Sequence, residues 1–513
     1  MIPLAHLVEA FGGTCERLAG SGPRLAGVQL DSRSVGAGDL FAALPGRAAD
    51  GARFAGDALA RGAAAILSPA RILPEPRAPV WVHRDARRVA GLAAARIYGE
   101  PSRGMSVVAV TGTNGKTTTA HLAGALLARC GRRPAVLGTA GHRLADGVLL
   151  RAAHTTPDAP EIQRLLARHR SLGGDSVAPE ASSHALEQER LAGLDVSVAV
   201  FTNLTRDHLD HHGDLERYAA AKERLFAGLR RGAFAVVNAD DPHAERMASA
   251  ARAAGAEVVR YGTRSRADLR ASRPRTGSSG TRFTVQGMGI SRTRVFLPLV
   301  GRFNVENALA ALAAVILSGA SPSDASEGLA SIPPPPGRLE RVANAGRGFA
   351  LFVDYAHTED ALRKVLRALR EVIDLEASGR EGDGGRLIVV FGCGGERDRG
   401  KRAPMGAAAS ELADIAVVTS DNPRGEDPRA IVDEILAGMR GARPGAEVVV
   451  ELDRRAAIRR AVELARPGDV VLVAGKGHET TQISAGEARA FDDRQVAAQA
   501  LAELGPSPVG GRL

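Results

Sequence analysis

The sequence predicts an α/β protein of three domains, and three observations support this prediction. The chain of 513 residues is too long for one ordinary hydrophobic core. Short apolar runs alternate with amphipathic helical segments over most of its length, which is the pattern of sheets covered by helices. Four consecutive prolines at 333–336 cannot join a helix or a central strand. We therefore predict domains at residues 1–102, 103–336 and 337–513.

The first domain is predicted to be small and of mixed α/β type. Short apolar runs at 27–33 and 39–44 are interrupted by Gly and Asp, and an Ala-rich segment near 55–65 favours a helix. Pro101 lies just before the next apolar strand and marks the predicted boundary.

The central domain is predicted to contain a mostly parallel sheet. Strands are expected at 106–110, 197–201 and 234–238, with helices at 117–130 and 216–229 between them. The Gly- and Ser-rich segment 271–281 is predicted to be a surface loop.

The C-terminal domain repeats the alternation, and we predict a Rossmann-like α/β domain without a phosphate loop of its own. Its strands are expected at four short apolar runs, namely 350–353, 387–391, 415–418 and 470–473. The amphipathic segment 359–373 predicts a helix, and the charged, Gly-rich segment 376–386 predicts a surface loop.

Composition excludes several classes of protein. The chain is 44% apolar and 24% charged, and its net charge of +9 comes from Arg residues spread along the sequence rather than from a basic block with aromatics. We therefore expect no nucleic-acid partner. No apolar run is long enough to span a membrane, no secretory leader is evident, and three scattered Cys residues predict no disulfide framework. We expect a cytoplasmic protein with no membrane partner.

A phosphate loop is the strongest functional pattern. An apolar strand leads into Gly112-Thr113-Asn114-Gly115-Lys116-Thr117-Thr118, and the last three residues open a helix. Backbone N–H groups of such a loop and the positive end of the helix dipole bind phosphates, while Lys116 reaches the terminal phosphates and Thr117 can ligate magnesium. A standard P-loop would have Gly at 110, where this chain has Val110. The loop predicts nucleoside triphosphate binding in a shortened variant.

Two further motifs follow predicted strand ends. Glu180 is either a solvated surface group or an oxygen ligand for magnesium beside Thr117. The segment 201–212 contains Asn203, two Asp and three His residues, and its His-x-x-His-His spacing suggests zinc. No Cys accompanies the His residues and no Glu lies in a metalloprotease arrangement, so a hard-cation or phosphate site fits better. A polar loop with an N-capping Asp remains the alternative. Lys222 lies in a helical segment and would, taken alone, be a solvated lysine.

Taken in order along the chain, these motifs resemble the Mur ligase family of ATP-dependent amide-bond ligases. The resemblance includes the short phosphate loop, Glu180 before Ser-Ser-His, the segment 202–210 and the Ala-Ala-Lys that ends at Lys222. It continues with Gly-Arg-Phe-Asn at 301–304, Gly-Arg-Leu-Glu-Arg at 337–341 and Asp-Tyr-Ala-His at 354–357, and so covers essentially the whole chain.

The resemblance implies a reaction and its substrates. The carboxylate of UDP-MurNAc-L-Ala-D-Glu would be phosphorylated by ATP to an acyl phosphate, which an amino-acid amine then attacks. The Asp-Asn-Pro-Arg segment at 421–424 is similar to that of members that add meso-diaminopimelate. This acceptor has a distal carboxylate that L-lysine lacks, and Arg424 offers a guanidinium for it, while Glu479 could pair with the distal ammonium.

Roles for individual residues are likewise implied by the resemblance. The expected catalytic residues are Lys116, Glu180, Asn203, His208 and Lys222. Two magnesium sites are implied, with ligands from Thr117, Glu180, His208 and Lys222, the last as a carbamate formed with carbon dioxide. The expected ATP contacts are Gly112, Thr113, Asn114, Gly115, Lys116, Thr117, Thr118, Asn304, Asn307, Arg341, Asp354 and His357. The expected contacts of the muramoyl-dipeptide nucleotide are Ser32, Thr155, Thr156, Ser182, Gln188 and Arg190. The expected diaminopimelate contacts are Arg397, Asp421, Asn422, Pro423, Arg424, Gly475 and Glu479. We expect a monomer.

Three alternatives remain open at this stage. A sister ligase, either lysine-adding or folylpolyglutamate-forming, would share the phosphate loop, although Arg424 and the N-terminal domain speak against it. A P-loop kinase or regulatory NTPase would turn ATP over without an acceptor. A basic nucleic-acid-binding module would bind DNA in a salt-sensitive way.

Overall fold

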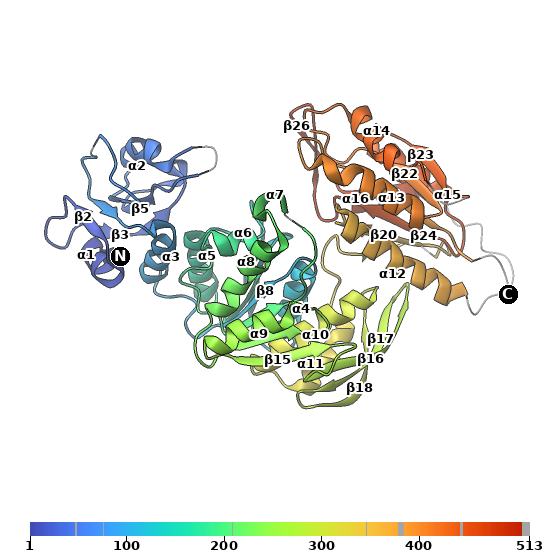
Figure 1. Cartoon of the computed structure of the whole chain (residues 1–513), viewed down its shortest axis with the longest axis horizontal. Helices are drawn as coiled ribbons and strands as arrows, with labels where there is room; N and C mark the ends of the chain where they lie inside the picture. Colours follow the sequence, from blue (N-terminus) through green and yellow to red (C-terminus); the bar gives the residue numbers. More distant parts are fainter. Residues whose placement is uncertain are drawn as a thin grey trace. The chain divides into compact units, whose positions relative to one another are not determined.

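The computed structural model describes residues 1–46, 49–74, 76–207, 209–344, 346–377, 384–441 and 445–504. By their internal packing these residues form two compact units. The first unit comprises Met1–Arg270 with Leu309–Ala325, and the second comprises Ala271–Ala308 with the described residues from Ser326 onward. The structure is mixed α/β with several sheets, as the sequence predicts (Figure 1). The boundaries of the three predicted domains stay a prediction.

The N-terminal part of the first unit is a five-stranded sheet in the order β2-β7-β6-β5-β4. Leu40 and Ala42 pack with helices on one face, and Phe41 between them packs on the other, as the two-residue period of a strand requires. The Ala-rich helix ends at Ala60, earlier than predicted, because an Arg-Gly turn precedes an apolar strand. The elements are β1 (Ile2–Pro3), α1 (Leu4–Phe11), β2 (Thr14–Glu16), β3 (Arg24–Leu25), β4 (Gly27–Gln29), η1 (Ser32–Ser34), β5 (Asp39–Ala42), η2 (Gly51–Phe54), α2 (Ala55–Ala60), β6 (Ala65–Ser68), β7 (Val80–Val82) and α3 (Ala86–Ile97).

The strands of the larger sheet in the first unit follow the order β11-β10-β9-β12-β8-β13-β14-β15. All neighbouring pairs among β9, β12, β8, β13, β14 and β15 are parallel, whereas β10 pairs antiparallel with β9 and with β11. Val107 to Val110 of β8 are fully buried, which is expected for a central strand with helices on both faces. The elements are β8 (Ser106–Thr111), α4 (Lys116–Arg129), β9 (Pro134–Gly138), β10 (Gly141–Arg143), β11 (Leu149–Leu150), α5 (Ala159–Ser171), β12 (Ser176–Pro179), α6 (Ser183–Glu187), β13 (Val198–Phe201), α7 (Leu209–His212), α8 (Leu215–Ala227), β14 (Phe234–Asn238), α9 (Ala244–Ala253) and β15 (Glu257–Gly262).

The segment 271–281 is not a surface loop, so that prediction was wrong. It belongs to two strands, β16 (Leu269–Gly277) and β17 (Gly280–Gly287), and β17 pairs antiparallel with β18 (Ile290–Leu297). Ala271 and Thr276 are buried. The alternation of apolar and polar residues that marks a strand is weak in this segment, because small and polar residues occupy the buried positions. Next along the chain come α10 (Arg302–Leu317), α11 (Pro322–Gly328) and η3 (Leu329–Ser331).

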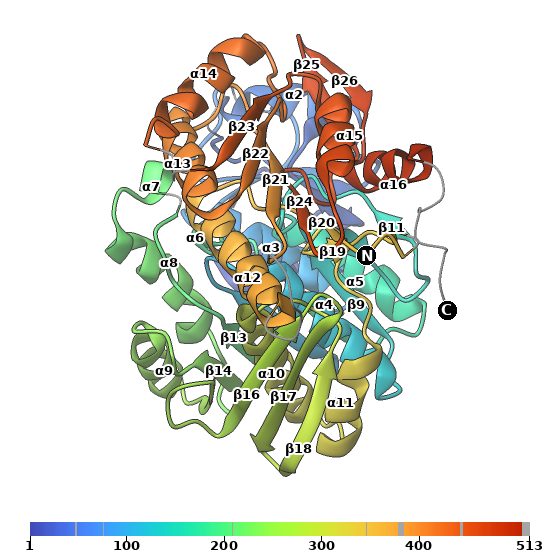
Figure 2. The same ribbon diagram turned by 90° about the vertical axis from the view of Figure 1, so that its right-hand side faces the viewer.

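The second unit contains a six-stranded sheet in the order β19-β20-β24-β21-β22-β23. Val389 and Phe391 of β21 pack with α12, α13 and α14, whereas Ile388 and Val390 pack with α15 and α16, so helices cover both faces (Figure 2). The elements are β19 (Glu340–Arg341), β20 (Ala350–Asp354), α12 (Glu359–Ala377), β21 (Leu387–Phe391), η4 (Arg399–Lys401), α13 (Arg402–Leu412), β22 (Ile415–Val418), α14 (Pro428–Gly438), β23 (Glu447–Val450), α15 (Arg454–Leu464), β24 (Val470–Ala474), β25 (Thr481–Ser484), β26 (Glu487–Ala490) and α16 (Asp493–Glu503).

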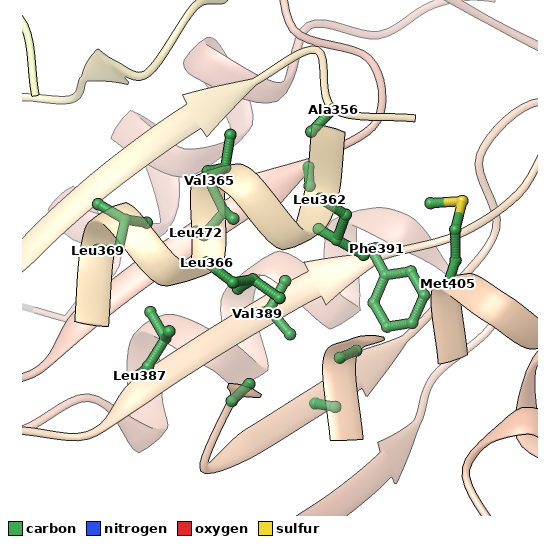
Figure 3. Packing of buried hydrophobic residues seen from close by; sticks show 14 of the residues in the cluster. Ala356, Leu362, Val365, Leu366, Leu369, Leu387, Val389, Phe391, Met405 and Leu472 are labelled. Atoms are coloured by element: carbon green, nitrogen blue, oxygen red, sulfur yellow. The ribbon is translucent and has the colours of Figure 1, made fainter. Parts of the chain in front are cut away.

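Helix α12 shows why the predicted amphipathic segment folds as it does. Leu362, Val365, Leu366 and Leu369 recur at helical spacing and face Phe391 and its neighbours on the sheet (Figure 3). Each fully buried side chain of this kind contributes about 1.5–3 kcal/mol of hydrophobic stabilisation. Of the helices in the described parts of the chain, none combines the length and the apolar content that a membrane span requires.

Candidate active site

The phosphate loop connects β8 to α4 at the carboxyl end of a central parallel strand. Gly115 is the N-cap of α4 with a φ of +85°, a conformation that favours glycine. At Gly112 a Cβ would lie 1.8 Å from the Thr202 hydroxyl oxygen, so this position cannot hold a side chain without a shift. Asn203 accepts from the Asn114 backbone N–H at 3.0 Å and donates to the Asn114 carbonyl at 3.2 Å. The predicted catalytic Asn203 therefore holds the loop in shape.

The Thr117 hydroxyl and the Glu180 carboxylate meet beneath this loop, although 63 residues separate them in the chain. Thr117 Oγ1 donates to Glu180 Oε2 at 3.0 Å, and only 1% of Glu180 is exposed. The Thr139 backbone N–H and hydroxyl also donate to Glu180, at 2.8 and 3.2 Å. A buried carboxylate beside two hydroxyls is a hard oxygen donor set, so these residues fit a magnesium ion.

Two lysines converge on the loop. Lys116 Nζ donates to the carbonyl oxygens of Gly112 and Thr113, at 2.9 Å each, and Lys222 Nζ donates to the Gly112 carbonyl at 2.9 Å. Lys222 is 1% exposed and its ammonium lies 4.4 Å from the centre of the Tyr218 ring. Burial, together with the charge of Lys116, holds the pKa of Lys222 well below its ordinary value. Lys222 is thus not the solvated lysine that its helix alone suggests.

His208 lies outside the described residues, so the structure says nothing of its predicted metal role. The two histidines that follow it are described. His211 Nε2 lies 2.8 Å from Glu187 Oε2, and His212 Nδ1 lies 3.2 Å from Glu187 Oε1. The rings of His184 and His211 stack at a centroid separation of 4.0 Å.

Several residues predicted to bind the muramoyl-dipeptide nucleotide form one hydrogen-bonded group in the first unit. Thr156 Oγ1 donates to the Glu180 carbonyl at 2.7 Å and accepts from the Ser182 backbone N–H at 3.1 Å. Arg190 donates to the Thr156 carbonyl at 2.8 Å and to Gln188 Oε1 at 2.9 Å.

The two remaining residues of that prediction are Thr155, in the loop before α5, and Ser32, on η1. Thr155 Oγ1 lies 3.0 Å from the Thr139 hydroxyl oxygen, which connects it to the residues around Glu180. Ser32 is buried at the start of η1, in the N-terminal sheet region.

The ATP contacts predicted in the second unit lie near the ends of β19, β20 and α10. Asn307 Nδ2 donates to Asn304 Oδ1 at 3.0 Å, and both residues are buried. The Asp354 carboxylate accepts from the backbone N–H groups of Leu339 and Ala356, at 2.7 Å each.

His357 and Arg341 complete that prediction in different surroundings. His357 Nδ1 lies 2.9 Å from the Tyr355 carbonyl, and burial with the nearby Lys401 charge lowers the pKa of His357. Arg341 is exposed on β19. The nucleotide-binding role of these residues stays a prediction.

The predicted diaminopimelate residues gather where two loops meet. Asn422 Nδ2 donates to Glu479 Oε2 at 3.1 Å, and Lys476 Nζ donates to the same oxygen at 3.0 Å. Lys476 is fully buried and also donates to Asn422 Oδ1 at 3.1 Å. Glu479 is therefore an oriented and partly neutralised carboxylate.

Arg424 lies at the edge of this group with a φ of +54°. Its Nη1 donates to the Gly395 carbonyl at 2.7 Å, and its backbone pairs with β25 through Ile483 and Ala485. Asp421 and Pro423 are buried beside it, and the Gly475 N–H donates to the Asp354 carbonyl at 3.0 Å. Arg397 is exposed.

Three residues of these groups were not selected from the sequence. Lys476 lies between the predicted contacts Gly475 and Glu479 in the sequence, and its buried ammonium donates to the Glu479 carboxylate. The roles of Thr139 and Tyr218 could not be predicted from the sequence, because each contacts a residue far away in the chain. Thr139 donates to Glu180, and the Tyr218 hydroxyl donates to Thr113.

The fold and the loop define a class of protein: an α/β protein with a shortened phosphate loop above a buried Thr–Glu pair. The Mur ligase middle domain matches residues 110–315, the Mur ligase glutamate ligase domain matches 337–477, and the Mur ligase family catalytic domain matches 24–97. The chain belongs to the Mur ligase family.

Individual relatives support the same membership. The UDP-N-acetylmuramoyl-L-alanyl-D-glutamate–2,6-diaminopimelate ligase of Solibacter usitatus is 45% identical over 484 residues, which is 94% of each chain. The ligase of the same name from Syntrophomonas wolfei is 42% identical and covers 93% of this chain and 94% of its own. A solved structure of an enzyme with this name is 36% identical, covers 94% and 96% of the two chains, and superposes with a TM-score of 0.68.

Proposed function

We propose that the protein is an ATP-dependent ligase that adds meso-2,6-diaminopimelate to the γ-carboxylate of D-Glu in UDP-MurNAc-L-Ala-D-Glu, with release of ADP and phosphate. The observation that supports this acceptor most directly is that Asn422 contacts both Arg424, through its backbone carbonyl, and Glu479, through its side chain. A guanidinium and an oriented carboxylate complement the distal carboxylate and ammonium of meso-diaminopimelate. The relatives named above carry the same substrates in their names.

In the first step, the γ-carboxylate attacks the terminal phosphorus of ATP and ADP leaves. This step brings negative charges together, so cations and N–H donors must surround the phosphates. Lys116 and the first N–H groups of α4 are proposed to bind phosphate oxygens, and hydrogen bonds of Asn203 and Thr202 with Asn114 hold the shape of the loop from which they extend. Thr117 and Glu180 would hold one magnesium ion, which neutralises phosphate charge when bound. His208 is proposed as a ligand of a second.

Lys222 is proposed to act as a carbamate. An uncharged amine attacks the carbon of carbon dioxide and then loses a proton, which leaves an anionic group with two oxygens. The lowered pKa of Lys222 supports this modification, since a lower pKa increases the fraction of uncharged amine at a given pH. A carbamate would attract a divalent cation that an ammonium would repel.

In the second step, the acceptor amine attacks the acyl phosphate carbon, phosphate leaves and an amide bond remains. Arg424 and Glu479 orient the distal end of the acceptor, which directs the other amine to the reacting carbon. We propose that the enzyme works as a monomer in the cytoplasm, without nucleic acid or membrane.

A phosphate-release assay with an amino-acid panel tests this function. The chain is supplied with ATP, magnesium, UDP-MurNAc-L-Ala-D-Glu and either meso-diaminopimelate, L-lysine or no acceptor, and the product is identified by mass. We expect rapid phosphate release and a tripeptide product with meso-diaminopimelate. A preference for L-lysine would refute the acceptor assignment. Fast ATP turnover without muramoyl-dipeptide nucleotide or acceptor would instead favour a kinase or NTPase.

A further inference from the structure

Glu187, His211 and His212 form a compact group in the first unit, here called the His–Glu cluster. Glu187 is the last residue of α6, and the two histidines end α7; both helices pack on α8 (Figure 1). One ligand atom from each of the three side chains lies within 4.8 Å of the other two. The fold thus adds a carboxylate to a histidine pair whose own segment contains no glutamate.

The imidazole of His212 is held in one orientation. Its Nε2 lies 2.9 Å from the Ser183 hydroxyl, which directs Nδ1 toward Glu187 Oε1. The ring is buried and packs on Tyr218 at a centroid distance of 5.0 Å. An imidazole fixed by a hydrogen bond at its second nitrogen is the arrangement that proteins use to orient metal ligands.

The protonation of the cluster also favours a cation. Although burial alone raises it, the pKa of Glu187 lies below its ordinary value because His211 and His212 hydrogen-bond to the carboxylate. Burial lowers the pKa of His212, against the opposing charge of Glu187, and so favours the neutral ring over the charged one. A carboxylate and a neutral imidazole are the forms that bind metal.

We propose that the His–Glu cluster binds a divalent first-row transition metal, with Zn²⁺ as the first ion to test. Two imidazole nitrogens and one carboxylate oxygen form a donor set that Zn²⁺ accepts, with water as a fourth ligand. Mg²⁺ prefers oxygen ligands, so this site differs in chemistry from the oxygen-lined Thr117–Glu180 pair. A bound ion would join the end of α6 to the end of α7.

Metal titration of the full chain, with any affinity tag removed and bound metals stripped by EDTA, tests the proposal. Zn²⁺ is titrated by calorimetry in excess Mg²⁺, without ATP or other substrates, so the result does not depend on the proposed function. Co²⁺ is titrated in parallel, because a site of low coordination number produces strong visible absorption. We expect one tight equivalent of Zn²⁺ and one Co²⁺ spectrum that Zn²⁺ abolishes. Absence of both in the wild-type protein would overturn the proposal.

Variants then locate the ion. His211→Gln and Glu187→Gln each remove one ligand and should weaken Zn²⁺ binding by at least about 100-fold, whereas Ser183→Ala should weaken it about 10-fold to 100-fold. The matched controls are His6→Gln, an exposed histidine of α1, and Glu189→Gln, a glutamate just beyond α6. Circular dichroism in EDTA verifies folding, and Ser183→Ala remains informative if a ligand variant is unfolded. Equal Zn²⁺ affinity in the ligand variants, in Ser183→Ala and in the controls would refute the assignment of the site.

Discussion

Replacing Arg424 with glutamine should remove most of the preference for meso-diaminopimelate over L-lysine. Arg424 Nη1 donates to the Gly395 carbonyl, whereas its Nε and Nη2 make no hydrogen bond to any residue that the structure describes. These two N–H groups can therefore form a two-point contact with a carboxylate. L-lysine has no carboxylate at this position and gains nothing from the guanidinium.

The size of the effect follows from these two bonds. A hydrogen bond to a charged group contributes about 1.5–3 kcal/mol, and the lower value applies here because Arg424 is only half-buried and water screens it. Two such bonds amount to about 3 kcal/mol, or about 100-fold in the ratio of kcat/KM for the two acceptors.

The assay measures phosphate release at several concentrations of each acceptor in wild type, Arg424→Gln and the control Arg429→Gln. Arg429 is exposed and pairs with Asp433 on α14, so its replacement should leave the ratio unchanged. The ratio is insensitive to a general loss of folded enzyme, since both acceptors are measured on the same sample. An equal loss of kcat/KM for both acceptors in Arg424→Gln would show that Arg424 supports the loop and does not select the acceptor.

Three further predictions concern the loop, Lys222 and a buried ion pair. Gly112→Ala should weaken ATP binding at least 10-fold and lower the free energy of unfolding by about 1–3 kcal/mol, because the new Cβ would clash with Thr202. ATP binding is measured by titration calorimetry and stability by thermal unfolding, with Gly56→Ala as the control because the space around Gly56 is open. Lys222 loses its proton at a lower pH in the folded chain than in the unfolded chain. As the pH rises from the folded pKa of Lys222 to its ordinary pKa, the free energy of unfolding of the unmodified wild type should therefore increase by up to about 1.4 kcal/mol per pH unit. Urea unfolding in CO₂-free buffer should show no such gain in Lys222→Met, and parallel profiles would contradict the lowered pKa. Asp493 accepts two hydrogen bonds, of 2.7 and 2.8 Å, from the fully buried Arg454. Asp493→Asn leaves this buried guanidinium without its counter-charge and should lower the free energy of unfolding by about 3–5 kcal/mol. The exposed Asp433→Asn should cost less than about 1 kcal/mol, and equal losses in the two variants would be inconsistent with this reasoning.

Local sequence patterns predicted the regular elements well where the apolar signal was strong. The strand expected at 387–391 is β21, and the helix expected at 359–373 is the first part of α12. The segment 271–281 failed because Ala271 and Thr276 occupy buried positions of β16 that larger apolar residues would have revealed. Pairing with distant strands stabilises such a segment, and that pairing is invisible in a short window of sequence.

The sequence by itself determined the phosphate loop, the order of strands and helices, and the motifs along the chain that resemble those of the Mur ligase family. These depend on local conformational preference and on spacing, which a chain carries without reference to its fold. Only the tertiary structure decided that Glu180 meets Thr117, that Lys222 is buried beside the loop, and that Glu187 joins His211 and His212. Each of these contacts joins residues more than 20 positions apart, and the environment they create sets the charge of the groups. The pKa of a lysine or the ligand set of a histidine pair is therefore a property of the packed protein.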